Sequence, residues 1–191
     1  MLRWLSRVLG VAPPAMQRRV VRWWPATVEH TRDDIDTDGL FVRLDRVLGL
    51  IEHHVPERFD QLRAHVAGFR VVRFPCRGAF QSDTRECLVE LTFLADAGRL
   101  DEEIAATIVH EGEHARHRAM AVPAIALADE ERACREAELE FGLRAPGGAK
   151  VVERARASLA LADDEVAPTV DWSVAVERMR AEDRRAKFND R

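Results

Sequence analysis

The sequence predicts an α+β fold in which a small antiparallel sheet packs on two long helices. Three observations support this expectation. Apolar residues recur at helical spacing in several segments, β-branched and aromatic residues gather in two short segments, and turn residues separate those two segments. The chain has 191 residues, a length that suits one domain, and 47% of them are hydrophobic, which is enough to build a core.

Two helices are expected in the first half of the chain. Apolar residues recur on one face between residues 40 and 51, which predicts an amphipathic helix. Pro56 suits the first turn of a second helix, which should end near Gly68. Before both helices, Trp24-Pro25 and the polar residues 31–34 are expected to form a loop.

Two strands are expected next, at residues 69–74 and 87–94. The second of them alternates apolar and polar residues, as a half-buried strand does. Residues 81–84, with the sequence Gln-Ser-Asp-Thr, supply turn residues between the two segments. The strands are therefore expected to pair antiparallel.

Helices are expected over the rest of the chain. Asp101 is a candidate N-cap for a helix that runs to about Met120, just before Pro123. A further helix should extend from about residue 129 to 142. Two more helical stretches fill the C-terminus, and the last of them forms a strongly charged tail over residues 171–191.

The N-terminal segment differs in composition from the rest. Residues 1–24 contain five arginines, three tryptophans and no acid, so we treat them as a basic leader before a single domain at residues 25–191. Basic residues interleaved with tryptophan could make weak contact with a membrane surface. No apolar run reaches the roughly 18 residues that span a bilayer, and a solvated or partly packed leader is the favoured alternative.

Charge and cysteine content narrow the classes of partner and compartment. Charged residues make up 32% of the chain and the formal net charge is −4, so no nucleic-acid partner is expected. The three cysteines form no CxxC pair and leave one over, which favours a reducing compartment. We therefore expect a cytoplasmic protein, with the inner face of the membrane as the alternative.

The residues that carry chemistry are His110-Glu111-Gly112-Glu113-His114, which fit the pattern H-E-x-x-H. His110 and His114 are one helical turn apart, so their imidazoles can converge on one cation, for which Zn²⁺ is well matched. Glu111 is placed to reach a zinc-bound water rather than the metal, and would act on it as general base.

A third ligand is expected on the following helix. Glu131 and Glu138 share a seven-residue stripe with apolar residues, and a carboxylate pointed inward is costly unless it meets a cation. The apolar members of this stripe are Leu127, Cys134 and Phe141. Glu131, 17 residues after His114, is the expected ligand, and Glu130 is its rival. Glu138 is expected to hold a histidine ring or an arginine.

Two further residues near the motif have weaker assignments. His117 lies on the same face as His110 but about 10 Å along the axis, too far for joint ligation. We expect it to be an electrostatic helper at most, and a surface histidine by default. Cys134 could serve as a soft ligand, although a buried free cysteine is the commoner state.

The stretch from Thr107 to Arg116, followed by Glu131-Arg-Ala-Cys-Arg-Glu-Ala-Glu138, resembles bacterial zincin-like proteins of the gluzincin kind. The similarity covers about residues 87–142. It implies a zincin-like fold, zinc on His110 and His114, and a downstream glutamate as third ligand. The activity that it implies is that of a zinc-dependent metallopeptidase acting on a peptide or protein substrate.

One departure from the gluzincin pattern concerns the oxyanion. Gluzincin peptidases usually have a tyrosine or histidine that steadies the tetrahedral intermediate, and this chain contains no tyrosine. The role would fall to His117, to Arg132 or Arg135, or to no residue. The alternative function is therefore a non-catalytic zinc-binding module with a regulatory or structural role.

Overall fold

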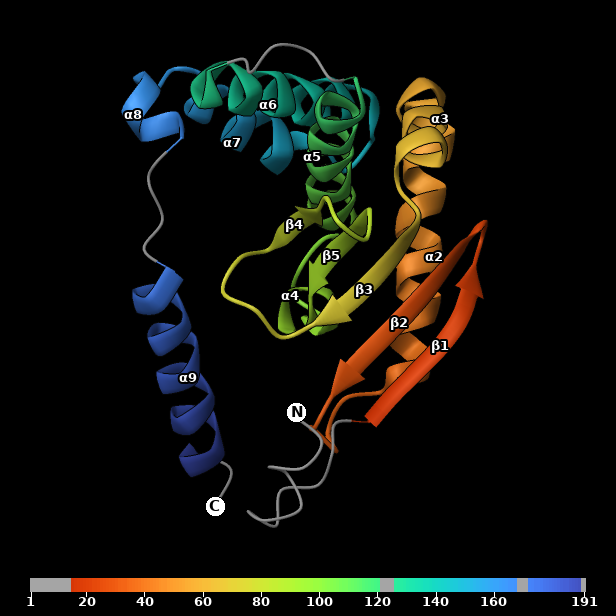
Figure 1. The fold of residues 1–191 in the computed structure, drawn as a ribbon, viewed down its shortest axis with the longest axis vertical. Helices are drawn as coiled ribbons and strands as arrows, with labels where there is room; N and C mark the ends of the chain where they lie inside the picture. The colour runs from red at the N-terminus through yellow and green to blue at the C-terminus, as the bar shows by residue number, and fades with distance from the viewer. Residues whose placement is uncertain (1–14, 121–125, 168–171, 190–191) are drawn as a thin grey trace.

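The structure, a computed structural model, describes residues 15–120, 126–167 and 172–189. It contains one open five-stranded sheet and helices, which confirms the α+β class (Figure 1). The two long helices α2 (Thr37–His54) and α5 (Asp101–Ala119) contact both the sheet and each other. A single apolar core joins these helices to the central strands.

The sheet is mixed rather than antiparallel. Its strands are β1 (Ala15–Val21), β2 (Trp24–His30), β3 (Gly68–Val72), β4 (Gly78–Gln81) and β5 (Glu86–Glu90). Their order is β1-β2-β3-β5-β4, and only the two outer pairs are antiparallel. The expected antiparallel pairing of the two central segments is wrong, because β5 turns back from β4 and enters the sheet beside β3 in parallel.

The second predicted strand ends earlier than expected. β5 stops at Glu90, and α4 (Leu91–Ala95) follows at once. The Glu90 carboxylate accepts a hydrogen bond of 2.7 Å from the Phe93 backbone N–H, so it caps the first turn of α4. The apolar residues at 91 and 93 are therefore buried on a helical turn. The turn expected at residues 81–84 is present at 82–85, but it joins β5 to β4 and not to β3.

The sheet begins inside the segment set apart as a leader. β1 pairs with β2 along its whole length, and the loop expected at Trp24-Pro25 is wrong because β2 starts there. Trp24 is buried, and its indole N–H donates to the Val66 carbonyl at 2.9 Å. Its ring meets those of Phe59 and Phe69 edge-on. Residues 1–14 of the expected leader lie outside the described residues.

The first helices match their sequence patterns. The apolar stripe between residues 40 and 51 is the buried face of α2, and α3 (Pro56–His65) begins at the predicted proline. Gly68 starts β3 rather than ending α3. A Cβ at Gly68 would lie 2.9 Å from the Pro25 carbonyl oxygen, so glycine allows β3 to run close beside β2.

The remaining helices follow α5 in the order of the chain. They are α6 (Leu127–Arg144), α7 (Ala149–Leu159), α8 (Asp163–Val166) and α9 (Trp172–Asn189). The first three lie together at one end of the molecule, whereas α9 lies on a flank beside the β3–β4 connection (Figure 1). An ion pair of 3.0 Å between Arg73 and Asp183 links α9 to that connection.

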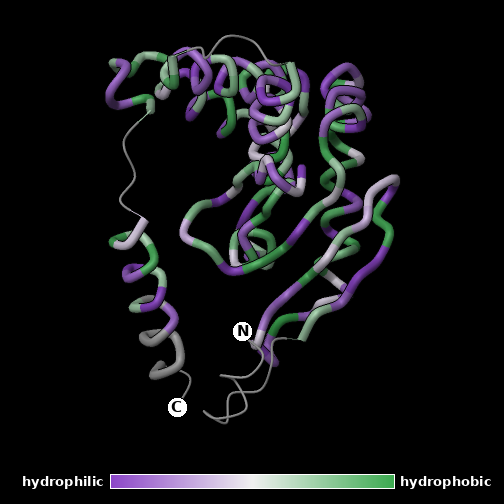
Figure 2. The backbone as a smooth tube through the Cα atoms, viewed as in Figure 1, coloured by the Kyte–Doolittle hydropathy of each residue, from purple (hydrophilic) through white to green (hydrophobic). Residues whose placement is uncertain are grey.

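Hydropathy along the backbone follows this arrangement. Figure 2 shows short green and purple segments alternating along the helices, the pattern of elements that bury one face. Within the described parts of the chain, no helix combines the length and the apolar character that a crossing of the bilayer requires.

Candidate metal centre

The helices α5 and α6 pack against each other and supply the residues of the H-E-x-x-H motif and of the acidic segment that follows it. The back of the motif is held by α3. A Cβ at Gly112 would lie 2.6 Å from the Leu62 side chain, so glycine lets α3 approach the motif helix closely. His110, Glu111 and Glu138 are all buried between these elements.

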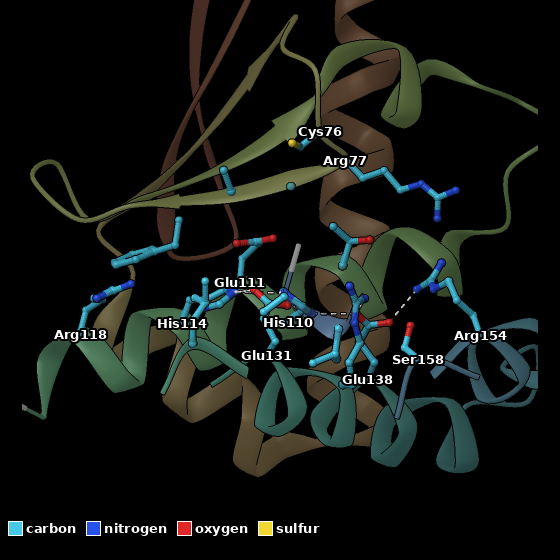
Figure 3. A pocket seen from close by; sticks show the side chains of 18 of the residues that line it. Cys76, Arg77, His110, Glu111, His114, Arg118, Glu131, Glu138, Arg154 and Ser158 are labelled. Atoms are coloured by element: carbon cyan, nitrogen blue, oxygen red, sulfur yellow. Dashed lines mark hydrogen bonds and ion pairs between the residues drawn. The ribbon is translucent and has the colours of Figure 1, made fainter. Parts of the chain in front are cut away.

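Three side-chain groups converge on one point between the two helices (Figure 3). The Nε2 atoms of His110 and His114 are 3.1 Å apart. The Glu131 carboxylate oxygens lie 3.5 Å from the first of these atoms and 3.3 Å from the second. A tetrahedral zinc with bonds of about 2.0–2.1 Å separates neighbouring ligand atoms by about 3.3 Å. The three groups therefore fit the ligand shell of one such ion.

A second pair of carboxylates fixes the orientation of the two imidazoles. Glu138 accepts from Nδ1 of His110, and Glu130 accepts from Nδ1 of His114, both at 2.8 Å. Because a carboxylate only accepts, each Nδ1 carries a proton, and when both rings are neutral each turns an Nε2 lone pair toward the other. Two facing lone pairs beside the Glu131 carboxylate require a cation, either a proton or a metal ion.

The pKa values of these groups also indicate that the site favours a bound positive charge. Burial opposes the charged form of His114, but hydrogen bonds to Cys134 and Glu131 raise its pKa to about 12. Burial likewise opposes ionisation of Glu138, yet His110, Arg135 and Arg154 lower its pKa to about 2. The pKa of Glu131 is also lowered, because the two histidines outweigh its desolvation. Both carboxylates are ionised at neutral pH.

Cys134 belongs to the same cluster. One donor atom from each of His110, His114 and Cys134 lies within 4.8 Å of the others, so these three residues could hold a metal ion. Burial raises the pKa of the Cys134 thiol to about 11, although its hydrogen bond to His114 favours the thiolate. From the sequence, Cys134 has only a minor place among the candidate ligands, because its seven-residue spacing from Phe141 indicates burial but not its distance from the histidines.

Glu111 faces the opposite wall of the site, next to the edge strand β4. A Cβ at Gly78 would lie 2.8 Å from Glu111 Oε1 and 2.6 Å from the Thr107 side chain. Burial raises the pKa of Glu111, and the neighbouring histidines only partly oppose this shift. A carboxyl with a raised pKa is suited to accept a proton near neutral pH.

These groups lie on the wall of a cleft of about 600 Å³ between α5, α6, α7 and residues 76–80. Leu127, expected in the core, is 55% exposed and lines this cleft instead, because it is the first residue of α6. His117 is not part of the lining, since its Nε2 lies 3.3 Å from a Glu113 carboxylate oxygen on another side of α5.

The two candidate arginines for the oxyanion differ in position. Arg132 points away from the cleft, where it donates to the carbonyls of Leu159 and Leu161. Arg135 lines the cleft and donates to Glu138 at 2.6 Å. Of these two, only Arg135 lies on the wall of the cleft.

The charged middle position of the motif is accommodated on the back of α5. Glu113 is buried and pairs with Arg58 of α3 at 2.9 Å and with Arg116 one turn further along α5. Arg58 also pairs with Glu140 of α6 at 2.8 Å. This network joins the three helices that surround the site.

Because β4 packs closely against α5 at Gly78, substitution of this glycine tests the packing of the cleft wall. We expect Gly78→Ala to lower the free energy of unfolding by about 1–3 kcal/mol, because its methyl group would overlap Thr107 and Glu111. Urea denaturation measures this loss. Gly98→Ala is the control, since Gly98 lies in an exposed turn whose nearest atom, an Asp96 oxygen, is 3.2 Å from the added Cβ. Equal losses for both variants would contradict the packing.

Comparison of the chain with protein families, with curated proteins and with solved structures gives no match.

Proposed function

We propose that the site binds zinc through His110, His114 and Glu131. The observation that carries this proposal is the triangle of two Nε2 atoms and one carboxylate, with edges of 3.1–3.5 Å. Imidazole and carboxylate donors in this number are typical of a catalytic zinc site, which keeps a fourth position for water or substrate.

Glu131 is a better third ligand than Cys134. Metal ligands bind in their deprotonated form. The pKa of Glu131 is lowered, so the carboxylate is ready to bind, whereas the Cys134 thiol has a raised pKa of about 11. Glu130 contacts Nδ1 of His114, on the side of the ring away from Nε2. We therefore assign it the role of orienting that ring and not of binding the metal.

We further propose that the protein is a zinc-dependent hydrolase in which Glu111 is the general base. Zinc bound here supplies a Lewis acid, which activates water and polarises a carbonyl group. Glu111 takes a proton from the attacking water and can pass it to the leaving amine. Its burial beside the two histidines and its raised pKa support this role.

A peptide is the substrate that suits the open edge of the sheet. Arg77 accepts a hydrogen bond of 3.0 Å from the Glu90 backbone, so Arg77 and Ala79 direct their backbone groups toward β5. The alternation of an antiparallel pair then directs the backbone groups of Gly78 and Phe80 toward the cleft. An extended peptide can add to this edge as a further strand. The proposed activity is therefore that of a metallopeptidase.

The absence of tyrosine favours a second candidate function, a zinc-binding module without catalysis. Arg135, the cleft-lining candidate for stabilising the oxyanion, already donates to Glu138 and would have to bind the oxyanion as well. The module would bind zinc and cleave nothing in a broad peptide library, so activity of the zinc-loaded protein separates the two candidates.

Metal analysis by mass spectrometry tests the zinc site itself. We expect one zinc per chain in the unaltered protein and none in His114→Ala, because that change removes one of the three converging groups. His117→Ala is the control, since His117 is on the same helix but does not line the cleft. Absence of stoichiometric zinc from the unaltered protein would overturn the proposal.

Metal analysis also decides whether Glu131 or Cys134 is the third ligand. Glu131→Gln should lose zinc, whereas Cys134→Ser should retain it. Substitution of cobalt for zinc gives a second readout, because a thiolate ligand produces an intense near-ultraviolet charge-transfer band and a carboxylate does not. A band that disappears in Cys134→Ser would assign the ligand to Cys134.

A further inference from the structure

One end of the cleft is rich in arginine. Arg77 and Arg154 line it together with Ser158, next to Glu138 (Figure 3). Arg135, which also lines the cleft, donates to Glu138 from α6. The three arginines come from three different parts of the chain, namely the segment before β4, α6 and α7. Arg118 lies at the other end of the cleft, beyond His114 (Figure 3).

The acids at this end do not balance the arginines. Glu138 accepts from Arg135 at 2.6 Å and from Arg154 at 2.9 Å, so a single carboxylate serves two guanidinium groups. Arg99 lies outside the lining and pairs with both Glu103 and Asp96, so it does not change this balance. The three arginines at this end therefore face one glutamate, which leaves a surplus of two positive charges.

Arg77 contributes an accessible share of this surplus. It is exposed, and no residue in the described part of the chain forms a hydrogen bond or an ion pair with its guanidinium group. Its guanidinium carbon lies 5.4 Å from the centre of the Phe93 ring. The side chain of Arg77 and that of Arg154 extend toward the same end of the cleft (Figure 3). Partial desolvation and then the like charge of Arg154 lower the pKa of Arg77.

Two neighbouring guanidinium groups at the end of a substrate cleft are suited to bind an anion. Guanidinium matches a carboxylate because it donates two parallel hydrogen bonds to the two oxygens. The Ser158 hydroxyl, on the same wall, offers a further donor. A bound carboxylate would also relieve the repulsion between the two arginines.

We propose that Arg77 and Arg154 bind a carboxylate group of the peptide substrate. The substrate class is then peptides with an acidic side chain or a free C-terminus at a fixed distance from the metal centre. This inference deepens the proposed function and rests on it for the nature of the substrate. Arg77 is the residue that sets this specificity, whereas Arg154 also positions Glu138.

The test measures binding without cleavage. Zinc-loaded Glu111→Gln protein is titrated calorimetrically with acetylated, amidated six-residue peptides of alanine and glycine that carry one glutamate at each position in turn. A matched set carries glutamine, and a third set has no glutamate but a free C-terminal carboxylate. We expect one glutamate position, or the free C-terminus, to bind about ten- to a hundredfold more tightly than its neutral counterpart.

Variants assign this preference to the arginines. Arg77→Gln should reduce the preference about tenfold or more, and Arg77→Glu should shift it toward peptides with lysine at the same position. Arg156→Gln is the control, because Arg156 is exposed two residues after Arg154 on α7 and does not line the cleft. Zinc content is measured for every variant, so that loss of the metal is recognised.

The outcomes separate this inference from the proposed hydrolysis. Equal binding of acidic and neutral peptides, or a preference that survives in Arg77→Gln, would overturn the carboxylate subsite. Cleavage by the unaltered protein with no preference for acidic peptides would overturn it too, while keeping the peptidase. If binding depends on Arg77 but the unaltered zinc-loaded protein cleaves no peptide, the carboxylate subsite is supported and the proposed peptidase activity is rejected.

Discussion

Replacing Glu111 with glutamine is expected to leave zinc binding intact and to lower the rate of peptide hydrolysis by about a hundredfold to ten-thousandfold. The loss follows from the removal of the general base, whose contribution in other enzymes is of this order. Zinc should be retained because Glu111 is not one of the three converging groups. Single-turnover cleavage of a peptide that the unaltered protein hydrolyses measures the effect.

Stability provides the control for this variant. The pKa of Glu111 is raised on folding, so ionisation costs more in the folded than in the unfolded protein, and the charged side chain destabilises the folded state at pH values above the unfolded pKa. Glutamine has the same shape without the charge, and we expect it to leave the free energy of unfolding unchanged or increased at pH 7. Full activity of Glu111→Gln would mean that another group is the base.

Replacing Glu138 with glutamine is the second large effect. Its side chain is 2% exposed and binds His110, Arg135 and Arg154. The pKa of Glu138 falls from 4.5 to about 2 on folding, and a shift of this size corresponds to about 3 kcal/mol of stability at neutral pH. We expect Glu138→Gln to lose about this amount, and to bind zinc about 10- to 100-fold more weakly because His110 loses its orienting carboxylate.

The pH dependence identifies the cause of that loss. A lowered pKa stabilises the folded state above the unfolded pKa of about 4.5, and this contribution disappears as the pH falls toward 2. The difference in unfolding free energy between the unaltered protein and Glu138→Gln should therefore shrink over this range. Chemical denaturation of both proteins without zinc measures it, with the exposed Glu136→Gln as control. A difference independent of pH would point to packing instead of charge.

The sequence was sufficient to predict the helices that carry the site. The motif helix and the acidic helix have strong periodic patterns, and their observed ends lie within two residues of the predicted ones. Spacing within a helix fixes which side chains share a face. It was therefore possible to select Glu131 and Glu138 as inward carboxylates, although not to determine which histidine nitrogen each would meet.

The order of the sheet and the residues of the far wall of the cleft could not be predicted from the sequence. β4 has only four residues, all partly buried, and shows no alternation that marks a strand. β1 is exposed over most of its length and rich in arginine, so it resembled a solvated leader. Arg77 and Arg154 meet at the cleft only through tertiary packing, because they are 77 positions apart in the chain and no local pattern brings them together.

The succession of α5 and α6 along the chain has a consequence for the order of folding. Glu131 lies 17 residues after His114, so bringing them together closes a short loop, whereas the sheet is not complete until β2 meets β3 across the whole of α2 and α3. Short loops close with a smaller loss of chain entropy and form faster. The helical pair can therefore assemble before the sheet that later supports it. A metal ion captured at that stage would act as a crosslink in a partly folded chain, and would make the rate of folding depend on its concentration.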